Sequence, residues 1–285
     1  MEIRRQTRET FLPHAAPFLL REEAMNNLLL GLGHTLVANP DAYPLPAYLA
    51  TVEQDGRVVL VALRTPPFGL ALSTVDPRCD RDAAAAALAA DVSTVFPALP
   101  GVAGPRAVVR TFLRHWEPLT GQRAALVRAE RIYELAEVVA PPPVSGSMRR
   151  ADVRDRDLLE AFVAAFQAES GGNAPDGAPA VVRRRLSTVG SAFYLWEDPG
   201  PVCLVGCSGL TPTGIRIGPV YTPPAFRRRG YAATLVARVS QSLLDGGRAR
   251  CFLYTDLANP TSNALYQRIG YRPVGDVDEF GLLPV

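Results

Sequence analysis

The sequence predicts an α+β protein made of two domains. The chain has 285 residues, which is long for one compact domain and about right for two. Hydrophobic residues make up 48% of the chain and charged residues 20%, so there is enough apolar material for folded cores. Three consecutive prolines followed by Ser-Gly-Ser interrupt the pattern between the halves. We therefore expect one domain over residues 1–140, a linker over 141–147 and a second domain over 148–285.

Strands and helices are expected to alternate in the second half. Apolar residues recur at helical spacing over 155–166 and again over 231–244, where Asp245-Gly246-Gly247 supplies a glycine stop signal. Turn residues around Asp198-Pro199 separate two apolar runs that predict paired strands. The expected order is a strand over 148–153, helices over 155–166 and 180–189, strands over 192–196, 202–210 and ending at 221, a helix over 231–244, a strand over 250–254, a helix over 260–269 and a strand from 271.

The first half shows a weaker version of the same pattern. We expect a helix over 16–30 and strands over 47–53 and 58–64 on either side of the hairpin turn Asp55-Gly56. A third strand over 69–73, a helix over 80–95 and candidate strands over 106–110 and 131–138 complete this half.

Composition excludes several classes of function. All 30 basic residues are arginine, which removes chemistries that need a Schiff-base or P-loop lysine. The net charge of +2 predicts no broad positive surface, so no nucleic acid partner is expected. The four cysteines form no CxxC pair and the three histidines lie far from them, so we expect neither a metal site nor a disulfide framework. No apolar segment fits a signal peptide or a membrane span, and we expect a cytoplasmic protein with no membrane partner.

The segment from Ile217 to Ala232 is the most informative part of the chain. It reads as a strand, a proline-led turn and an arginine-glycine loop that opens a helix, which is a layout that holds a pyrophosphate on free backbone N–H groups. Gly230 lets the loop backbone approach a diphosphate, and the small residues Ala232 and Ala233 keep side chains out of its way. Pro219 fits either a strand that splays from its neighbour to admit an extended ligand or an ordinary sheet edge. By itself the loop could also be a plain helix start with solvated arginines.

Two motifs together resemble those of the GNAT superfamily of acyl-coenzyme A-dependent N-acetyltransferases. The run Arg227-Arg228-Arg229-Gly230-Tyr231-Ala232 is similar to the Arg/Gln-x-x-Gly-x-Gly/Ala signature of that family. The segment from Asn259 to Tyr271 resembles its second signature, an asparagine followed by a helix that ends in Tyr-x-x-x-Gly-Tyr/Phe. They occur in the expected order, and the resemblance covers about residues 206–274.

The resemblance implies a fold as well as a co-substrate. The fold would be α+β (α/β), with tandem GNAT-like domains that each have a mixed, mostly antiparallel twisted sheet flanked by helices. The first domain would be a degenerate or accessory copy, because Asp76-Pro77-Arg78-Cys79 stands where the arginine-glycine loop would be. The co-substrate would be acetyl-CoA, with no metal.

Site residues follow from the same resemblance. Tyr266 would be the general acid that protonates the departing coenzyme A thiolate, although a tyrosine on such a helix also fits the core. A backbone N–H near Val220 or Tyr221 would stabilise the charge on the thioester oxygen, which makes Val220 a catalytic candidate. The residues expected to bind the cofactor are Val220, Tyr221, Thr222, Arg227, Arg228, Arg229, Gly230, Tyr231, Ala232, Ala233, Asn259 and Asn263.

Several polar candidates keep two explanations. Asn259 precedes a proline and is a natural N-cap, a role that can coexist with contacts to pantetheine. Asn263 can face the cofactor or the solvent, and Asp256 can orient a substrate ammonium, act as a base or cap the next turn. Glu169 and Asp176 lie where the acceptor would arrive, as a general base or as solvated loop residues, and a water chain is a further route for the proton.

The expected function is the transfer of an acetyl group from acetyl-CoA to a primary amine of a small molecule or amino acid by direct attack. The alternative is a non-catalytic acyl-CoA-binding sensor or interaction protein, whose first half engages a partner. The sequence pattern indicates no particular oligomeric state.

Overall fold

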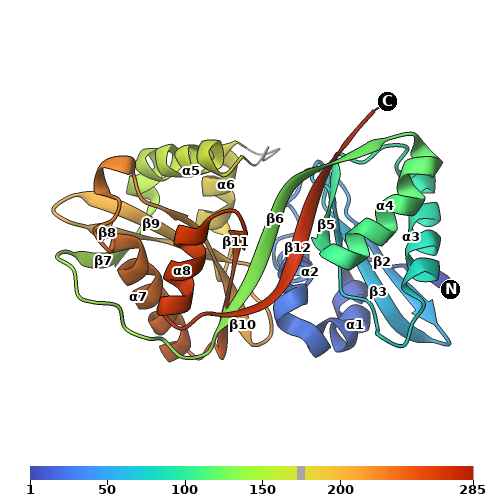
Figure 1. Cartoon of the computed structure of the whole chain (residues 1–285), viewed down its shortest axis with the longest axis horizontal. Helices are drawn as coiled ribbons and strands as arrows, with labels where there is room; N and C mark the ends of the chain where they lie inside the picture. Colours follow the sequence, from blue (N-terminus) through green and yellow to red (C-terminus); the bar gives the residue numbers. More distant parts are fainter. Residues whose placement is uncertain (172–176, 285) are drawn as a thin grey trace. The chain divides into compact units, whose positions relative to one another are not determined.

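A computed structural model describes residues 1–171 and 177–284 (Figure 1). The chain divides into two compact units, the first made of Met1–Arg131 with Gly275–Val285 and the second of Ile132–Val274. These limits differ from the expected linker over 141–147 because strands β6 (Arg123–Leu135) and β12 (Arg272–Leu283) each contribute residues to both units. Independent domains over 1–140 and 148–285 stay a prediction.

The same order of elements occurs twice along the chain. The first copy is β1 (Glu2–Arg5), α1 (Arg8–Leu19), the 3₁₀ turn η1 (Leu20–Glu22), α2 (Glu23–Ala38), β2 (Tyr48–Gln54), β3 (Arg57–Arg64), β4 (Leu70–Leu72), α3 (Arg81–Val95), β5 (Gly101–Pro105), α4 (Arg106–Thr120) and β6. The second copy is β7 (Ser147–Arg150), η2 (Val153–Asp155), α5 (Arg156–Ser170), α6 (Ala178–Ser187), β8 (Ala192–Glu197), β9 (Pro201–Ser208), β10 (Gly214–Tyr221), η3 (Pro224–Phe226), α7 (Tyr231–Asp245), β11 (Arg250–Asp256), α8 (Pro260–Arg268) and β12. Without the 3₁₀ turns both read β-α-α-β-β-β-α-β-α-β, and the predicted α+β class is confirmed.

Each unit has a mostly antiparallel sheet with one parallel pair of neighbours. The strand order is β1-β2-β3-β4-β5-β12 in the first unit and β6-β11-β10-β9-β8-β7 in the second. The parallel pairs are β4–β5 and β10–β11. Each pair is joined through a helix, α3 or α7, as a parallel connection requires.

Helices cover both faces of each sheet (Figure 1). Successive strand residues face opposite sides, so Leu60 packs with α3 and α4 whereas Val61 packs with α1 and α2. In the second unit, Val205 belongs to the core under α7 and α8, and Leu204 belongs to the core under α5 and α6. Because alternate strand residues face opposite sides of the sheet, each unit has one hydrophobic core on each face of its sheet.

The expected elements of the second half lie close to the observed ones, whereas two in the first half are wrong. The strand expected over 106–110 is the first part of α4, because Val108, Val109, Phe112 and Trp116 are buried at helical spacing. The strand at this place is β5, which ends just before it. The single helix expected over 16–30 is two helices, the first of which begins after the capping residue Thr7.

Candidate functional site

The parallel pair β10–β11 separates towards the ends of its strands. Its ladder runs from Gly214↔Arg250 to Arg216↔Phe252, whereas β10 continues to Tyr221 and β11 to Asp256. On its other edge β10 stays paired with β9 through a bulge between Ile217 and Val220. This geometry is the splayed strand that Pro219 suggested, and it leaves one backbone edge of β10 unpaired beside β11.

One backbone N–H near the bulge is directed at this unpaired edge. Val220 pairs with Val205 and Tyr221 pairs with Leu204, both on β9. Because neighbouring residues of a strand direct their N–H groups to opposite sides, one of Val220 and Tyr221 points towards β9 and the other away from it. The arrangement supports the expected donor near Val220.

Arg185 holds the bulge, and the sequence analysis did not single it out. Its guanidinium donates a hydrogen bond to the carbonyl oxygen of Gly218 and lies over the ring of Phe193, 5.4 Å from the ring centre. Three consecutive arginines on α6 give no sign of which one turns inward. The presence of Gly206 opposite is the available signal, because a Cβ there would lie 2.5 Å from the Arg185 side chain.

The loop that opens α7 has an unusual backbone. Gly230 has φ of +87° and is the N-cap of α7, without a capping side chain. Arg228 has φ of +62°, which costs a residue with a side chain about 1 kcal/mol or more. The first-turn N–H groups of Tyr231, Ala232 and Ala233 therefore follow a glycine rather than a side-chain acceptor, as a phosphate-binding helix start requires.

Arg227 is brought together with two other predicted site residues. Its Nη2 atom lies 2.7 and 2.6 Å from the two carboxylate oxygens of Glu169 at the end of α5. Its Nε donates to the carbonyl oxygen of Thr222 at 2.8 Å. The guanidinium of Arg229 lies 5.7 Å from the centre of the Phe226 ring. Arg227 is expected to bind the cofactor and Glu169 to meet the acceptor. In the structure the two side chains form an ion pair with each other.

The Tyr231 side chain points into the core rather than towards the loop. It is buried, and its hydroxyl donates to Asp198 Oδ2 at 2.5 Å. The same oxygen accepts the Ser145 hydroxyl, and these two hydrogen bonds lower the pKa of Asp198. Any part of Tyr231 in phosphate binding is therefore limited to its backbone N–H. Asp198 entered the sequence analysis only as a turn residue.

Tyr266 lies in the core close to the end of β10. Its ring packs edge to face with Tyr271 at 6.0 Å, and burial raises the pKa of its hydroxyl well above the ordinary value. The second cause of this shift is the nearby Cys203 thiol, which accepts a hydrogen bond from the Thr222 hydroxyl at 3.2 Å. Tyr266 and Thr222 thus lie near the same sulfur, which places Tyr266 close to the residue that follows β10.

The polar residues at the start of α8 are engaged in capping. Asn259 Oδ1 accepts the backbone N–H three residues on at 3.0 Å. Asn263 Nδ2 donates to the carbonyl oxygens of Asp256 and Asn259, both at 2.8 Å, and its Oδ1 accepts the Tyr133 hydroxyl. Asp256 Oδ1 accepts the backbone N–H two residues on. Capping hydrogen bonds therefore account for the positions of all three side chains. Asp176 lies outside the described residues.

The first unit lacks both an uncapped helix start and a splayed strand pair at the equivalent elements, which are α3 and the strands β4 and β5. The Asp80 carboxylate accepts the N–H groups of Asp82 and Ala83 at the start of α3, so negative charge fills that helix end. A Cβ on Gly104 of β5 would lie 2.6 Å from the carbonyl oxygen of Leu72 on β4, so these strands stay close. These contacts agree with the absence of an arginine-glycine loop there.

All four cysteines are free thiols, and Cys203 and Cys207 are buried in the core as expected for same-face strand residues. Within residues 1–171 and 177–284, no three His, Cys, Asp or Glu side chains are grouped so as to hold a metal ion. None of the helices in that part of the chain has the length and apolar character needed to cross a membrane.

Known families share this architecture. Residues 208–279 match the family model described as FR47-like protein, which is related to GNAT. A tandem GNAT protein from the clavulanic acid biosynthesis pathway is similar over 99% of this chain and 97% of its own, with a TM-score of 0.56 and 13% identity. The chain has a tandem GNAT-like fold. The GNAT-like fold also appears in a GCN5-related N-acetyltransferase from Sphaerobacter thermophilus, similar over 98% of this chain and 94% of its own with a TM-score of 0.59 and 19% identity. A Drosophila protein covers 99% of this chain and 98% of its own, with a TM-score of 0.69 and 14% identity. No curated protein matches in sequence.

Proposed function

We propose that the protein is an acyl-CoA-dependent N-acyltransferase, which transfers an acetyl group from acetyl-CoA to a primary amine of a small molecule or amino acid. The observation that carries this proposal is the ladder of β10–β11, which ends at Arg216↔Phe252 beside the glycine-led start of α7. The extended thioester arm of the cofactor needs such an unpaired strand edge. The diphosphate at the other end of that arm needs free backbone N–H groups.

The residues present fit acetyl-CoA. Arg228 and Gly230 have positive φ angles, as residues of anion-binding loops often do, and the first turn of α7 adds the N–H groups of Tyr231, Ala232 and Ala233. Arg227 and Arg229 supply positive charge next to them. The strand residues Val220, Tyr221 and Thr222 would lie along the pantetheine, while Asn259 and Asn263 support the site mainly by fixing α8.

Direct transfer requires one bond to form as another breaks. The neutral amine attacks the thioester carbonyl, the carbon–nitrogen bond forms, and the carbon–sulfur bond breaks with its electron pair on sulfur. The nitrogen releases its surplus proton to solvent water, and Tyr266 takes a proton back from solvent after the transfer. The backbone N–H near Val220 stabilises the charge on the carbonyl oxygen. Tyr266 donates its hydroxyl proton to the sulfur, and its raised pKa keeps that proton in place at neutral pH.

The test is Tyr266→Phe, assayed for acetyl transfer to a panel of amines. We expect kcat to fall by about 100-fold or more while acetyl-CoA binding is kept. The matched control is Tyr271→Phe, which removes the hydroxyl of the neighbouring ring that bonds Ser240 at 2.8 Å. This control should lower the melting temperature but not kcat. Unchanged kcat in Tyr266→Phe would remove Tyr266 from the mechanism.

An acyl-CoA-binding sensor is the second candidate. It is favoured by the first unit, where Asp80 fills the end of α3 that would otherwise meet a phosphate. A sensor would gain stability from acetyl-CoA, by about 2.7 kcal/mol at a hundredfold excess over Kd, without turning over any amine. Turnover with wild-type protein would exclude it.

A further inference from the structure

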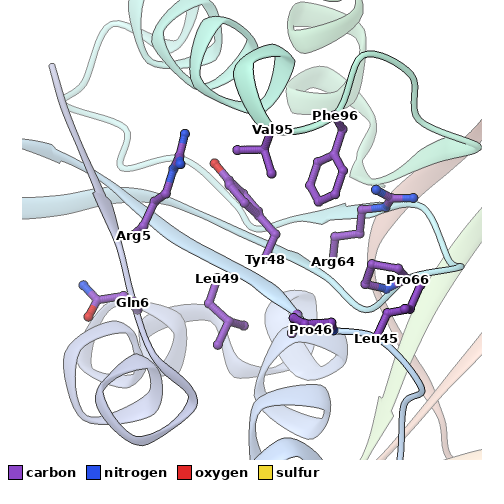
Figure 2. Close-up of a pocket in the computed structure, with 11 residues that line it drawn as sticks. Arg5, Gln6, Leu45, Pro46, Tyr48, Leu49, Arg64, Pro66, Val95 and Phe96 are labelled. Carbon is purple, nitrogen blue, oxygen red and sulfur yellow. The ribbon is translucent and has the colours of Figure 1, made fainter.

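A cavity in the first unit is lined by the buried arginine Arg64. The cavity has a volume of about 570 Å³, which lies in the range of small-molecule sites. It is formed by the end of β1, the start of β2, the end of β3 and the end of α3, and Figure 2 shows the side chains that line it. It lies at the carboxyl end of α3, away from the helix start discussed above.

Arg64, the last residue of β3, is 8% exposed. Its Nε donates to the carbonyl oxygen of Phe68 at 2.9 Å, and its guanidinium lies 4.2 Å from the centre of the Phe96 ring. Within the described part of the chain no carboxylate forms an ion pair with it. An arginine keeps its charge when buried, and a buried charge needs a counter-charge. The ring of Phe96 offsets only part of that cost.

The other arginine at this cavity is already neutralised. Arg5 Nη2 lies 2.9 Å from Asp91 Oδ1, and Asp91 Oδ2 accepts the Tyr48 hydroxyl at 2.7 Å. Figure 2 shows Tyr48, Phe96 and Arg64 side by side with Phe96 in the middle, and Tyr48 and Phe96 meet edge to face at 5.8 Å. The cavity therefore presents one unbalanced positive charge at the side of an aromatic wall.

Apart from Gln6, the rest of the lining is apolar and partly open to solvent. Leu45 is 54% exposed and Val95 is 38% exposed, although both are large aliphatic side chains. Pro46, Leu49 and Pro66 add further apolar surface. A ligand that covered this rim would remove apolar area from water while its charged group met Arg64.

We propose that this cavity binds a small organic carboxylate with an aliphatic or aromatic body. A single guanidinium matches a carboxylate in a forked, two-bond geometry. A phosphate dianion would require more donors than one free arginine supplies, because Arg5 is held by Asp91. Burial lowers the pKa of Arg64, and that cost is relieved when an anion is bound.

The test measures the affinity of the full-length protein for phenylacetate and hexanoate by calorimetry or ligand-observed NMR. Phenylacetamide, which has the same body without the charge, and inorganic phosphate are the comparison probes. We expect saturable binding of the carboxylates at millimolar concentration or below, and at least about tenfold weaker binding of the other two. Coenzyme A at saturation should leave the carboxylate affinity unchanged.

Two variants and a matched control locate the site. Arg64→Met should weaken carboxylate binding by at least about tenfold, whereas Arg57→Met, at the exposed start of the same strand, should not. Because Arg64→Met also loses the bond to Phe68, Val95→Asp is tested beside it: a carboxylate at this exposed rim should repel the ligand without altering the core. Absence of binding in the wild type, equal binding of phenylacetamide, competition by coenzyme A, or wild-type affinity in both variants would overturn the proposal.

Discussion

Arg227 and Glu169 form a two-oxygen ion pair across the mouth of the proposed acetyl-CoA site, with Nη2 at 2.7 and 2.6 Å from the carboxylate oxygens. Their side chains are 42% and 48% exposed, so solvent screens the pair. The pair links the end of α5 to the loop before α7, which we propose binds the diphosphate. Glu169 therefore competes with any phosphate for the same guanidinium.

Removing this competitor should tighten acetyl-CoA binding. We expect Glu169→Gln to lower the KM for acetyl-CoA by about two- to fivefold, and Arg227→Ala to raise it. Glu160→Gln is the matched control, because it removes a carboxylate of the same helix that pairs with Arg156. Steady-state kinetics with acetyl-CoA varied would measure the effect, and equal KM values for the two glutamine variants would contradict it.

A side chain at Gly230 should damage both folding and cofactor binding. Its φ of +87° disfavours any side chain, and a Cβ would lie 2.9 Å from Val144 Cγ1. Gly230→Ala should cost about 1–2 kcal/mol of stability and raise the KM for acetyl-CoA. Gly247 has φ of +90° with open space around it, so Gly247→Ala should cost stability but leave KM unchanged. An equal KM in both variants would mean that the loop does not bind the cofactor.

Asp278 should be a strong contributor to the stability of the first unit. Its carboxylate is fully buried and bonds Arg106 Nε at 2.9 Å and Arg110 Nε at 3.1 Å. We expect Asp278→Ala to lower the free energy of unfolding by about 2–3 kcal/mol, less than for a fully buried pair because both arginines contact solvent. Urea denaturation would measure this, with Glu2→Ala, at the exposed Arg4–Glu2 pair, as a control expected to change little. A loss as small as in the control would contradict the assignment.

The buried thiols should make the fold sensitive to alkali. Burial raises the pKa of the Cys203 and Cys251 thiols from 9.0 to about 12. Between these values the unfolded chain releases protons that the folded chain retains, so the contribution of these thiols to stability is unchanged below pH 9 and falls as the pH rises, by about 1.4 kcal/mol per unit for each thiol. Chemical denaturation across this range should show a shallower fall in a Cys203→Ala, Cys251→Ala double variant. A parallel pH dependence would contradict the prediction.

Cleavage within residues 141–147 should not release the second half of the chain. Strand β12 pairs with β5 from Val277↔Pro105 to Gly281↔Gly101, so the C-terminal strand completes the first unit. A protease site inserted over residues 141–147 should give two fragments on a denaturing gel that still migrate together in gel filtration. Separation without denaturant would favour the independent domains expected from sequence.

The local structure and the motifs of this protein can be predicted from its sequence. Hydrophobic periods of 3.6 and 2 located nearly all elements of the second half, because helices and strands there are each amphipathic. Gly230 and the three arginines before it identified a helix start suited to phosphate, because glycine adopts a positive φ without steric cost. In the first half, the valines at 108 and 109 suggested a strand because the helical spacing becomes visible only when Trp116 is included.

Which of these residues contact one another depends on the tertiary fold. The ion pair of Arg227 with Glu169 joins residues 58 positions apart, and the hydrogen bond from the Tyr133 hydroxyl to Asn263 joins residues 130 positions apart. The sequence does not indicate that Arg64 is buried, because its burial beside Phe96 depends on the packing of β3 against the end of α3. Likewise the C-terminal strand belongs to the first unit because its partner is β5, and strand pairing depends on long-range register that no local pattern encodes.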